Sequence, residues 1–225
     1  MRLDGSRVLI AGATGAVGGA LAEALSGAGA RLAPAGRDGR RLERLRHSLG
    51  AVPACTFEAY DLDGCAALPG WAHAEPGGLD GVLYTAGSVA FGPAGELPDA
   101  VAEHLTAVNL AAPAALLRAS LPLVSPGGTL MAVTGVVAER PQPLMADYSA
   151  SKAALSAWLS AVRREQRGHL HVMEARLGHL DTDFRARAVH GSPPALPPGE
   201  SLEGAVAAVM EGLRADAPLV GQGSR

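Results

Sequence analysis

The sequence predicts an α/β protein in which parallel strands alternate with helices that cover both faces of one doubly wound sheet. Short apolar runs alternate with stretches of helical periodicity, and most of these runs end at a glycine signal. With 225 residues and 48% hydrophobic content, the chain can form one domain with a substantial core, so we treat residues 1–225 as a single domain. The net charge of −3 gives no electrostatic footprint for nucleic acid.

The first apolar run, residues 7–11, is typical of a buried parallel strand, and helical spacing follows over residues 19–25. Between them lies a glycine-rich turn, residues 12–18. Small residues let a backbone approach a pyrophosphate, and a helix N-terminus offers N–H donors and a positive dipole. The alternative is a glycine-rich turn that binds nothing. We favour nucleotide binding, and the candidate residues in this turn are Gly12, Thr14, Gly15, Val17 and Gly18.

The second strand, residues 31–35, is followed by Gly36, Arg37 and Asp38. A dinucleotide site that prefers NAD usually ends this strand with an acid that binds the ribose 2′-hydroxyl. Gly36 takes that place here, and the adjacent Arg37 can bind a 2′-phosphate through a charge-assisted fork. The pattern therefore predicts NADP(H). A helix is expected over residues 40–49, with most of its arginines on a solvated face.

A weaker third strand is expected over residues 53–60, with Asp61 and Leu62 after it. Asp61 can face the adenine edge of a cofactor, or it can cap a helix, and the residues do not separate these alternatives. Residues 71–79 are expected to form a loop. Strand four is expected over residues 81–85, and Ala86 and Gly87 then let the backbone pass close to a ligand. Residues 91–99 are expected to form a surface loop.

The second half of the chain continues the alternation. A helix is expected over residues 100–123, with a possible kink at Pro113. Asn109 lies inside it among apolar neighbours, as a structural tie or as part of a polar relay. Strands are expected over residues 128–134 and 170–176, with Thr182 after the second. Residues 185–199 are expected to form an irregular lid or loop, residues 200–215 a final helix, and residues 219–221 at most a vestigial strand.

Tyr148 and Lys152 begin the helix expected over residues 148–167. Positions four apart share a helix face, so the phenol and the ammonium point the same way. A nearby cation lowers the pKa of a tyrosine and makes it usable as an acid–base group. Lys152 is also the only lysine in the chain. The alternative is an ordinary surface lysine beside a half-buried tyrosine.

These residues converge on one place. In an open parallel sheet, ligands bind beyond the carboxyl ends of the strands. The glycine turn, Arg37, Asp61 and Ala86-Gly87 all fall at such ends, and the helix of Tyr148 follows another.

In this order and at these separations, the motifs resemble the short-chain dehydrogenase/reductase family over nearly the whole chain. The resemblance implies a Rossmann-like fold and hydride transfer between a nicotinamide cofactor and a carbonyl or alcohol. Tyr148 would act as the acid–base group, while Lys152 would hold the nicotinamide ribose and depress the pKa of Tyr148. Asn109 would hold a water that joins Lys152 to solvent, and Thr182 would bind the nicotinamide carboxamide.

The chain departs from the family pattern at several positions. The family's catalytic serine lies thirteen residues before the tyrosine, which is Gly135 here. The adjacent Thr134 has a hydroxyl, but successive strand residues point to opposite faces, so it can substitute only if the strand has ended or bulges there. Ala16 takes the place of the middle glycine of the turn, Tyr84-Thr85 replace two asparagines, and Leu177 replaces a proline. The chain is also expected to stop short of the family's last strand.

We expect an NADPH-dependent carbonyl reductase or alcohol dehydrogenase with a small-molecule substrate and no metal. One alternative is an NADP-binding protein with little turnover that acts as a sensor or assembly partner. Another is an isomerase or dehydratase on the same scaffold. The N-terminus has no long apolar segment beyond residues 8–11, so we expect a cytoplasmic protein that is not bound to a membrane. The family resemblance implies a homodimer or homotetramer.

Overall fold

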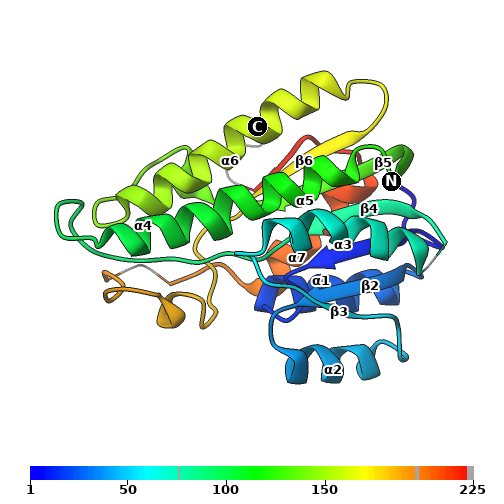
Figure 1. Cartoon of the computed structure of the whole chain (residues 1–225), viewed down its shortest axis with the longest axis horizontal. Helices are drawn as coiled ribbons and strands as arrows, with labels where there is room; N and C mark the ends of the chain where they lie inside the picture. The colour runs from blue at the N-terminus through cyan, green and yellow to red at the C-terminus, as the bar shows by residue number, and fades with distance from the viewer. Residues whose placement is uncertain (76, 196–197, 222–225) are drawn as a thin grey trace.

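The structure, a computed structural model, describes residues 1–75, 77–195 and 198–221. It contains one seven-stranded sheet in the order β3-β2-β1-β4-β5-β6-β7, in which every neighbouring pair is parallel (Figure 1). This confirms the predicted doubly wound α/β architecture. The strands are β1 (Arg7–Ala11), β2 (Arg31–Gly36), β3 (Cys55–Thr56), β4 (Leu79–Tyr84), β5 (Val124–Val133), β6 (His171–Arg176) and β7 (Leu219–Gly221).

Helices cover both faces of the sheet, and each face has its own hydrophobic core. One core packs α1 and α7 against the sheet, and the other packs α3, α5 and α6 against the opposite face. The helices are α1 (Ala16–Gly27), α2 (Gly39–Ser48), α3 (Leu62–Ala74), α4 (Asp99–Thr106), α5 (Ala112–Ser120), α6 (Ala146–Glu165) and α7 (Leu202–Arg214), with short helical turns η1 (Ala107–Ala111), η2 (Val136–Ala138) and η3 (Arg185–Arg187).

The helix expected over residues 100–123 is continuous from α4 to α5, but its middle turn, η1, is a π-helix. Pro113 has no N–H to donate to the carbonyl four residues earlier, which belongs to Asn109. The phenol of Tyr84 donates to the carbonyl of Val108 at 2.9 Å. These two features favour a wide turn at Asn109. By length and composition alone, Asp99–Ser120 could cross a membrane, but many of its residues pack in the interior, as in a core helix.

Two expectations near the sheet edge were wrong. The strand expected over residues 53–60 is only Cys55–Thr56. Thr56 pairs with Gly36, the last residue of β2, so the ladder has no partner beyond it, and Pro53 has no N–H to extend it in the other direction. The loop expected over residues 71–79 begins later, since α3 continues to Ala74 with Pro69 inside the helix. The buried residues Leu68 and Ala72 lie on the same helix and pack in the core, which outweighs the hydrogen bond that the proline removes.

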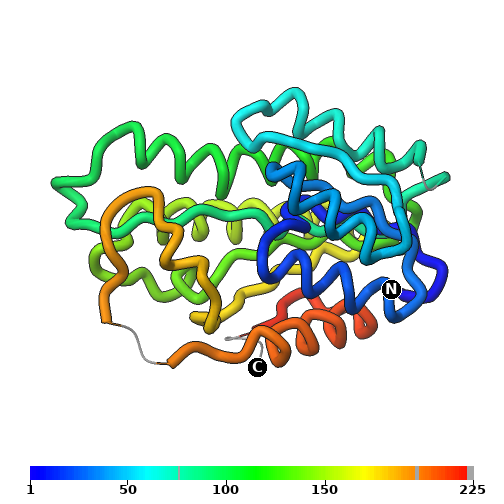
Figure 2. The backbone as a smooth tube through the Cα atoms, turned by 90° about the horizontal axis from the view of Figure 1, so that it is seen from below, coloured from blue at the N-terminus to red at the C-terminus, as the bar shows by residue number. Residues whose placement is uncertain are grey.

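The last strand is present. β7 pairs in parallel with β6 from Leu219 to Gly221, so the expectation that the chain stops short of it was wrong. Part of the expected lid, residues 196–197, lies outside the described residues. The part before it is bonded to the loop that follows β4, through Val189 N to Val89 O at 2.9 Å and Phe91 N to His190 O at 3.0 Å (Figure 2). Phe91 is therefore buried rather than on the surface.

Candidate active site

Tyr148 and Lys152 lie in the first two turns of α6, and both are buried, with 9% and 3% of their surface exposed. The Nζ of Lys152 donates to the carbonyl oxygen of Val133, the last residue of β5, at 3.0 Å. The lysine is therefore not an ordinary surface residue. It is a cation inside the protein, anchored to the carboxyl end of a central strand.

Burial shifts the titration of both groups. It lowers the pKa of Lys152 to about 8, because an ammonium is poorly solvated there. It also raises the pKa of Tyr148 well above its usual value. We expected Lys152 to lower the pKa of Tyr148; in this structure burial, which disfavours the phenolate, dominates and the net shift is upward.

Asn109 joins the loop after β4 to α6, and its side chain is completely buried. Its Oδ1 accepts the N–H of Ser88 at 3.0 Å, while its Nδ2 donates to the carbonyl of Ser88 at 2.9 Å and to Ser151 Oγ at 3.1 Å. Ser151 in turn donates to the carbonyl of Tyr148 at 2.8 Å. The side-chain amide is thus a structural tie, one of the two roles that the sequence allowed.

Three of the predicted site residues, Gly87, Asn109 and Lys152, lie close together. A Cβ on Gly87 would lie 3.5 Å from both Asn109 Oδ1 and Lys152 Nζ, and 3.9 Å from the ring of Phe184. Phe184 also packs in one apolar cluster with Tyr148 and Val137. The structure places its ring at this junction.

Thr134 does not face this space. Its N–H donates to the carbonyl of Ala175 at 3.0 Å, so the strand register continues through it and its side chain turns toward α6. Its hydroxyl is buried and donates to Glu174 Oε1 at 2.7 Å. Glu174 also accepts from Ser156 and Arg176, and these donors hold its pKa below the usual value although burial opposes them. The geometry argues against Thr134 as the replacement for the serine.

Gly135, at the serine position, has φ of 133°, a conformation that favours glycine. A Cβ there would have room, with the nearest atoms, Leu177 O and Val137 Cγ2, at 3.7 Å. The backbone rather than space therefore disfavours a serine at this position.

The glycine turn is closely packed against the end of β4. A Cβ on Gly12 would overlap the backbone nitrogen of Ala86, and one on Gly18 would overlap the carbonyl of Gly12. Gly15 is the N-cap of α1 and offers no side chain to the first-turn N–H groups, and that turn contains no acidic residue. Val17 packs against the core that lies between the sheet and helices α1 and α7. This turn, residues 12–18, is called the glycine cradle below. It fits a diphosphate, because its donors are backbone N–H groups at the start of α1.

The residues expected at the adenosine end also lie at strand ends. The side chain of Thr14 fills the space beside Gly36, which is the last residue of β2, and Arg37 follows, exposed. Asp38 caps α2 by accepting the N–H of Arg41 at 3.0 Å.

Asp61 caps α3 in the same way as Asp38 caps α2, through the N–H of Gly64 at 2.9 Å, so the capping role is observed. Leu62 beside it is 43% exposed. Thr182, beyond β6, is half-buried, and its Oγ1 accepts the N–H of Phe184 at 3.4 Å.

Thr85, one of the residues that replace an asparagine, has a structural role. Its hydroxyl donates to the carbonyl of Ala11 at 3.1 Å and so ties the ends of β4 and β1. Sequence reasoning missed Ser88 and Glu174 altogether. A glutamate between the apolar residues Met173 and Ala175 of a buried strand was the signal that could have revealed Glu174.

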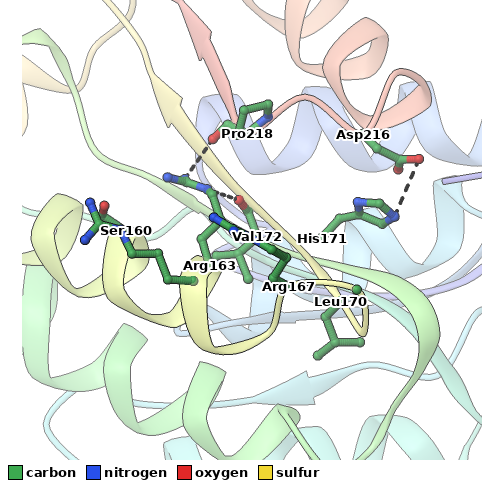
Figure 3. Close-up of a pocket in the computed structure, with 10 residues that line it drawn as sticks. Ser160, Arg163, Arg167, Leu170, His171, Val172, Asp216 and Pro218 are labelled. Carbon is green, nitrogen blue, oxygen red and sulfur yellow. Dashed lines mark hydrogen bonds and ion pairs between the residues drawn. The ribbon is translucent and has the colours of Figure 1, made fainter.

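A surface cavity of about 500 Å³ lies at the other end of the sheet, where α6 ends and β6 begins (Figure 3). Arg163 there donates to the carbonyls of Val172 and Pro218 at 2.7 and 2.8 Å, and His171 pairs with Asp216 at 3.6 Å. No predicted site residue lines this cavity. Arg163 ties β6 to the segment before β7, which is a structural role.

Comparison with known proteins gives consistent results. The family model described as short chain dehydrogenase matches residues 6–192. A short chain dehydrogenase of Pseudocercospora fijiensis is 29% identical over 175 residues, which are 74% of this chain and 57% of that protein. Dehydrogenase/reductase SDR family member 7B of Danio rerio is 30% identical over 199 residues, 82% of this chain and 64% of that protein. The chain thus spans less than two thirds of the length of these curated relatives.

Solved structures share the fold. A short chain dehydrogenase/reductase from Burkholderia phymatum in complex with NAD superposes with a TM-score of 0.90 at 19% identity, over 98% of this chain and 90% of that one. A short chain dehydrogenase from Burkholderia cenocepacia in complex with NADP gives 0.85 at 22% identity, over 100% and 99%. With the sheet order, the glycine cradle and the family match over residues 6–192, these findings show that the chain belongs to the short-chain dehydrogenase/reductase family.

Proposed function

We propose that the protein transfers hydride between NADP(H) and a small carbonyl or alcohol, with Tyr148 as the acid–base group. The observation that carries this proposal is the junction beside Gly87, where Lys152 Nζ and Asn109 Oδ1 face one space at the carboxyl ends of the strands. A buried cation is costly, and this one is the chain's only lysine. Such groups concentrate at functional sites.

A bound nicotinamide would supply or accept the hydride, and the chain's own residues would manage the proton. Tyr148 keeps its phenolic proton at neutral pH because burial raises its pKa, and this is the form that protonates a carbonyl oxygen in reduction. Lys152, one turn further along α6, would offset the charge of the phenolate that remains. Thr182 would hold the carboxamide, and the glycine cradle would hold the diphosphate.

The acid–base role is tested with Tyr148→Phe, which removes only the hydroxyl. We expect turnover of NADPH with simple ketones to be abolished, while NADPH affinity measured by calorimetry stays within about twofold of wild type, because the phenol acts on the substrate. Affinity serves as the folding control. Turnover that survives this substitution would exclude Tyr148 as the acid.

The preference for NADP rests on Arg37, which is exposed at the end of β2 with no acid at Gly36. We expect NADPH to bind more tightly than NADH. Arg37→Ala should weaken NADPH binding by about 10- to 100-fold, as the loss of a charge-assisted hydrogen bond predicts, and leave NADH unchanged. Arg44→Ala, on the exposed face of α2, is the matched control. Equal affinities of the wild type for the two cofactors would contradict the proposal.

One observation favours a second function, an NADP-binding protein with little turnover. Gly135 offers no hydroxyl, and the hydroxyl of Thr134 is committed to Glu174. Losing the usual donor would slow carbonyl reduction by on the order of a hundredfold. A wild-type protein that binds NADPH tightly but reduces none of a panel of ketones and aldehydes would favour this second function.

A further inference from the structure

We propose that the surface cavity at the end of α6 binds a soluble small molecule that carries a phosphoryl group. The cavity measures about 500 Å³ and lies where α6 ends and β6 begins, whereas Tyr148 and Lys152 lie at the start of α6 (Figure 3). The two places are therefore at opposite ends of the same helix. The cavity is separate from the proposed active site, and binding there does not depend on hydride transfer.

Positive charge collects around this cavity. Besides a histidine, its charged lining residues are three arginines and one aspartate, in a chain whose net charge is −3. Arg163 and Arg164 lie in the last turn of α6, and Arg167 lies in the turn that follows. Within residues 1–75, 77–195 and 198–221, no carboxylate forms an ion pair with any of the three. An anionic ligand would supply the counterion that these guanidinium groups lack.

The one carboxylate on the cavity lining is already paired. Asp216 contacts the amino group of Met1, and its other oxygen lies 3.6 Å from Nε2 of His171, toward which it points (Figure 3). The C-terminal end of α6 also opposes an anion. A helix end carries only about half an elementary charge, however, and its effect fades beyond the last turn. Three full positive charges outweigh it.

Arg163 is held in place before a ligand binds. Its side chain is half-buried, and it donates through Nε to the carbonyl of Val172 at 2.7 Å and through Nη2 to that of Pro218 at 2.8 Å. A guanidinium has five N–H donors, so these two bonds fix its plane and leave others for a ligand. Burial lowers the pKa of Arg163, because its charge is poorly solvated there, and a bound anion would offset that cost.

The donors suit a phosphoryl group. The planar fork of arginine matches the oxygens of phosphate, and its charge strengthens each hydrogen bond. A phosphoryl group carries about −1.5 to −2 charge at neutral pH, so it offsets more of the three positive charges than a single carboxylate would. The hydroxyl of Ser160 lines the same cavity and adds a donor.

The shape of the site favours a soluble ligand. Small-molecule sites commonly measure about 300–1,000 Å³, and this cavity falls within that range. Arg164 and Arg167 are exposed at its rim, so they can close on a ligand that Arg163 holds. Because the arginines line a hollow rather than a flat face, we assign them to a small molecule and not to a membrane surface.

The test titrates the protein with inorganic pyrophosphate at constant ionic strength and follows the ring signals of His171 by NMR. His171 lines the cavity, so its signals report binding there and not at the glycine cradle. The variant His171→Asn removes these signals and so assigns them. We expect a saturable shift in the wild type. Arg164→Gln and Arg167→Gln should each weaken binding by about 10- to 100-fold, as the loss of a charge-assisted hydrogen bond predicts.

Arg118→Gln is the matched control. Arg118 is also exposed and also lies in the last turn of a helix, α5, but it does not line the cavity. This variant should bind pyrophosphate as the wild type does. A His171 shift that does not saturate, or that sodium chloride reproduces at the same ionic strength, would overturn the proposal. Equal affinities of the control and of both cavity variants would overturn it as well.

A second readout is stability in urea. Pyrophosphate should raise the unfolding midpoint of the wild type and of Arg118→Gln by more than that of the double variant with Arg164→Gln and Arg167→Gln, because a ligand that binds only the folded state stabilises it. Equal rises in the three proteins would contradict a site at the cavity. Neither readout uses turnover, so an inactive wild type would count against the proposed function and not against this site.

Vesicles of phosphatidylcholine and phosphatidic acid distinguish the other source of phosphoryl groups, a lipid headgroup. We expect the wild type to stay in solution when these vesicles are sedimented, while His171 responds to pyrophosphate. Sedimentation of the wild type with the vesicles, together with no response of His171 to pyrophosphate, would assign the arginines to a membrane surface and would overturn the proposal.

Discussion

Lys152 offers a direct test of how the site is built, because it is the only lysine and its titration gives a single signal. Its ammonium is 3% exposed and donates one hydrogen bond, to Val133, and burial lowers its pKa from 10.5 to about 8. The test is a pH titration of the wild type and of the variant Lys152→Met. The substitution keeps the side-chain length but removes the charge.

The size and sign of the effect follow from the pKa. One pKa unit corresponds to about 1.4 kcal/mol, so the shift from 10.5 to about 8 means that the charged lysine destabilises the fold by about 3 kcal/mol. Below pH 8 both states are protonated and the whole penalty is present. Between pH 8 and 10.5 the unfolded chain binds more protons than the folded one, so the free energy of unfolding rises with pH.

Lys152→Met should therefore be more stable than wild type at neutral pH, by about 2 kcal/mol. Removing the charge gains about 3 kcal/mol, and leaving the Val133 carbonyl unpaired costs about 1 kcal/mol. This advantage should shrink as the pH rises above 8. Cys65 has the opposite effect, because burial raises its pKa from 9.0 to about 11, but it is present in both proteins and cancels in the difference.

The assay is NMR of isotope-labelled lysine, together with urea unfolding of both proteins across this pH range. A lysine that titrates near 10.5 would show that burial does not destabilise its charged form in the folded protein. A stability difference between wild type and Lys152→Met that does not change with pH would refute it as well.

Three further predictions concern the supporting structure, each measured by urea unfolding. Gly18→Ala should lose about 1–3 kcal/mol because its Cβ would overlap a backbone carbonyl, whereas Gly19→Ala, with its nearest atom at 3.3 Å, should lose much less. Glu174→Gln should lose about 3–5 kcal/mol at neutral pH, because it breaks the buried pair with Arg176. Because the pKa of Glu174 is lowered, its contribution is present above pH 4.5 and is lost as the pH falls through its folded pKa, so the variant should lose less stability in acid. Gly135→Ser should lose about 1–3 kcal/mol through its positive φ. Stabilities equal to wild type would contradict each prediction.

The places of the glycine turn and of Arg37 in the fold were predictable because their signals are local. Gly12 and Gly18 lie where a side chain cannot fit, and Arg37 directly follows a strand, so sequence order alone places them. The alternation of side chains along a strand also correctly indicated that Thr134 would not face the site while the strand continues through it. Its partner was not predictable, since Glu174 lies forty residues later on a neighbouring strand.

The remaining errors have physical causes of the same kind. The proline and glycines within residues 71–79 indicated a loop from Trp71, but α3 continues to Ala74 because its buried face packs in the core. The wide turn at Asn109 depends on Tyr84, which comes from another element. Similarly, the sequence placed Lys152 near Tyr148 but could not show how far burial would shift either pKa.

The proposed function requires that Tyr148 protonates a carbonyl that receives hydride from NADPH. The most direct measurement is the transfer of deuterium from labelled NADPH to a simple ketone, followed in the alcohol product by mass spectrometry. We predict label in the alcohol with the wild type and none with Tyr148→Phe, although both proteins bind NADPH. Equal labelling by the two proteins, or no labelling by the wild type, would contradict this function.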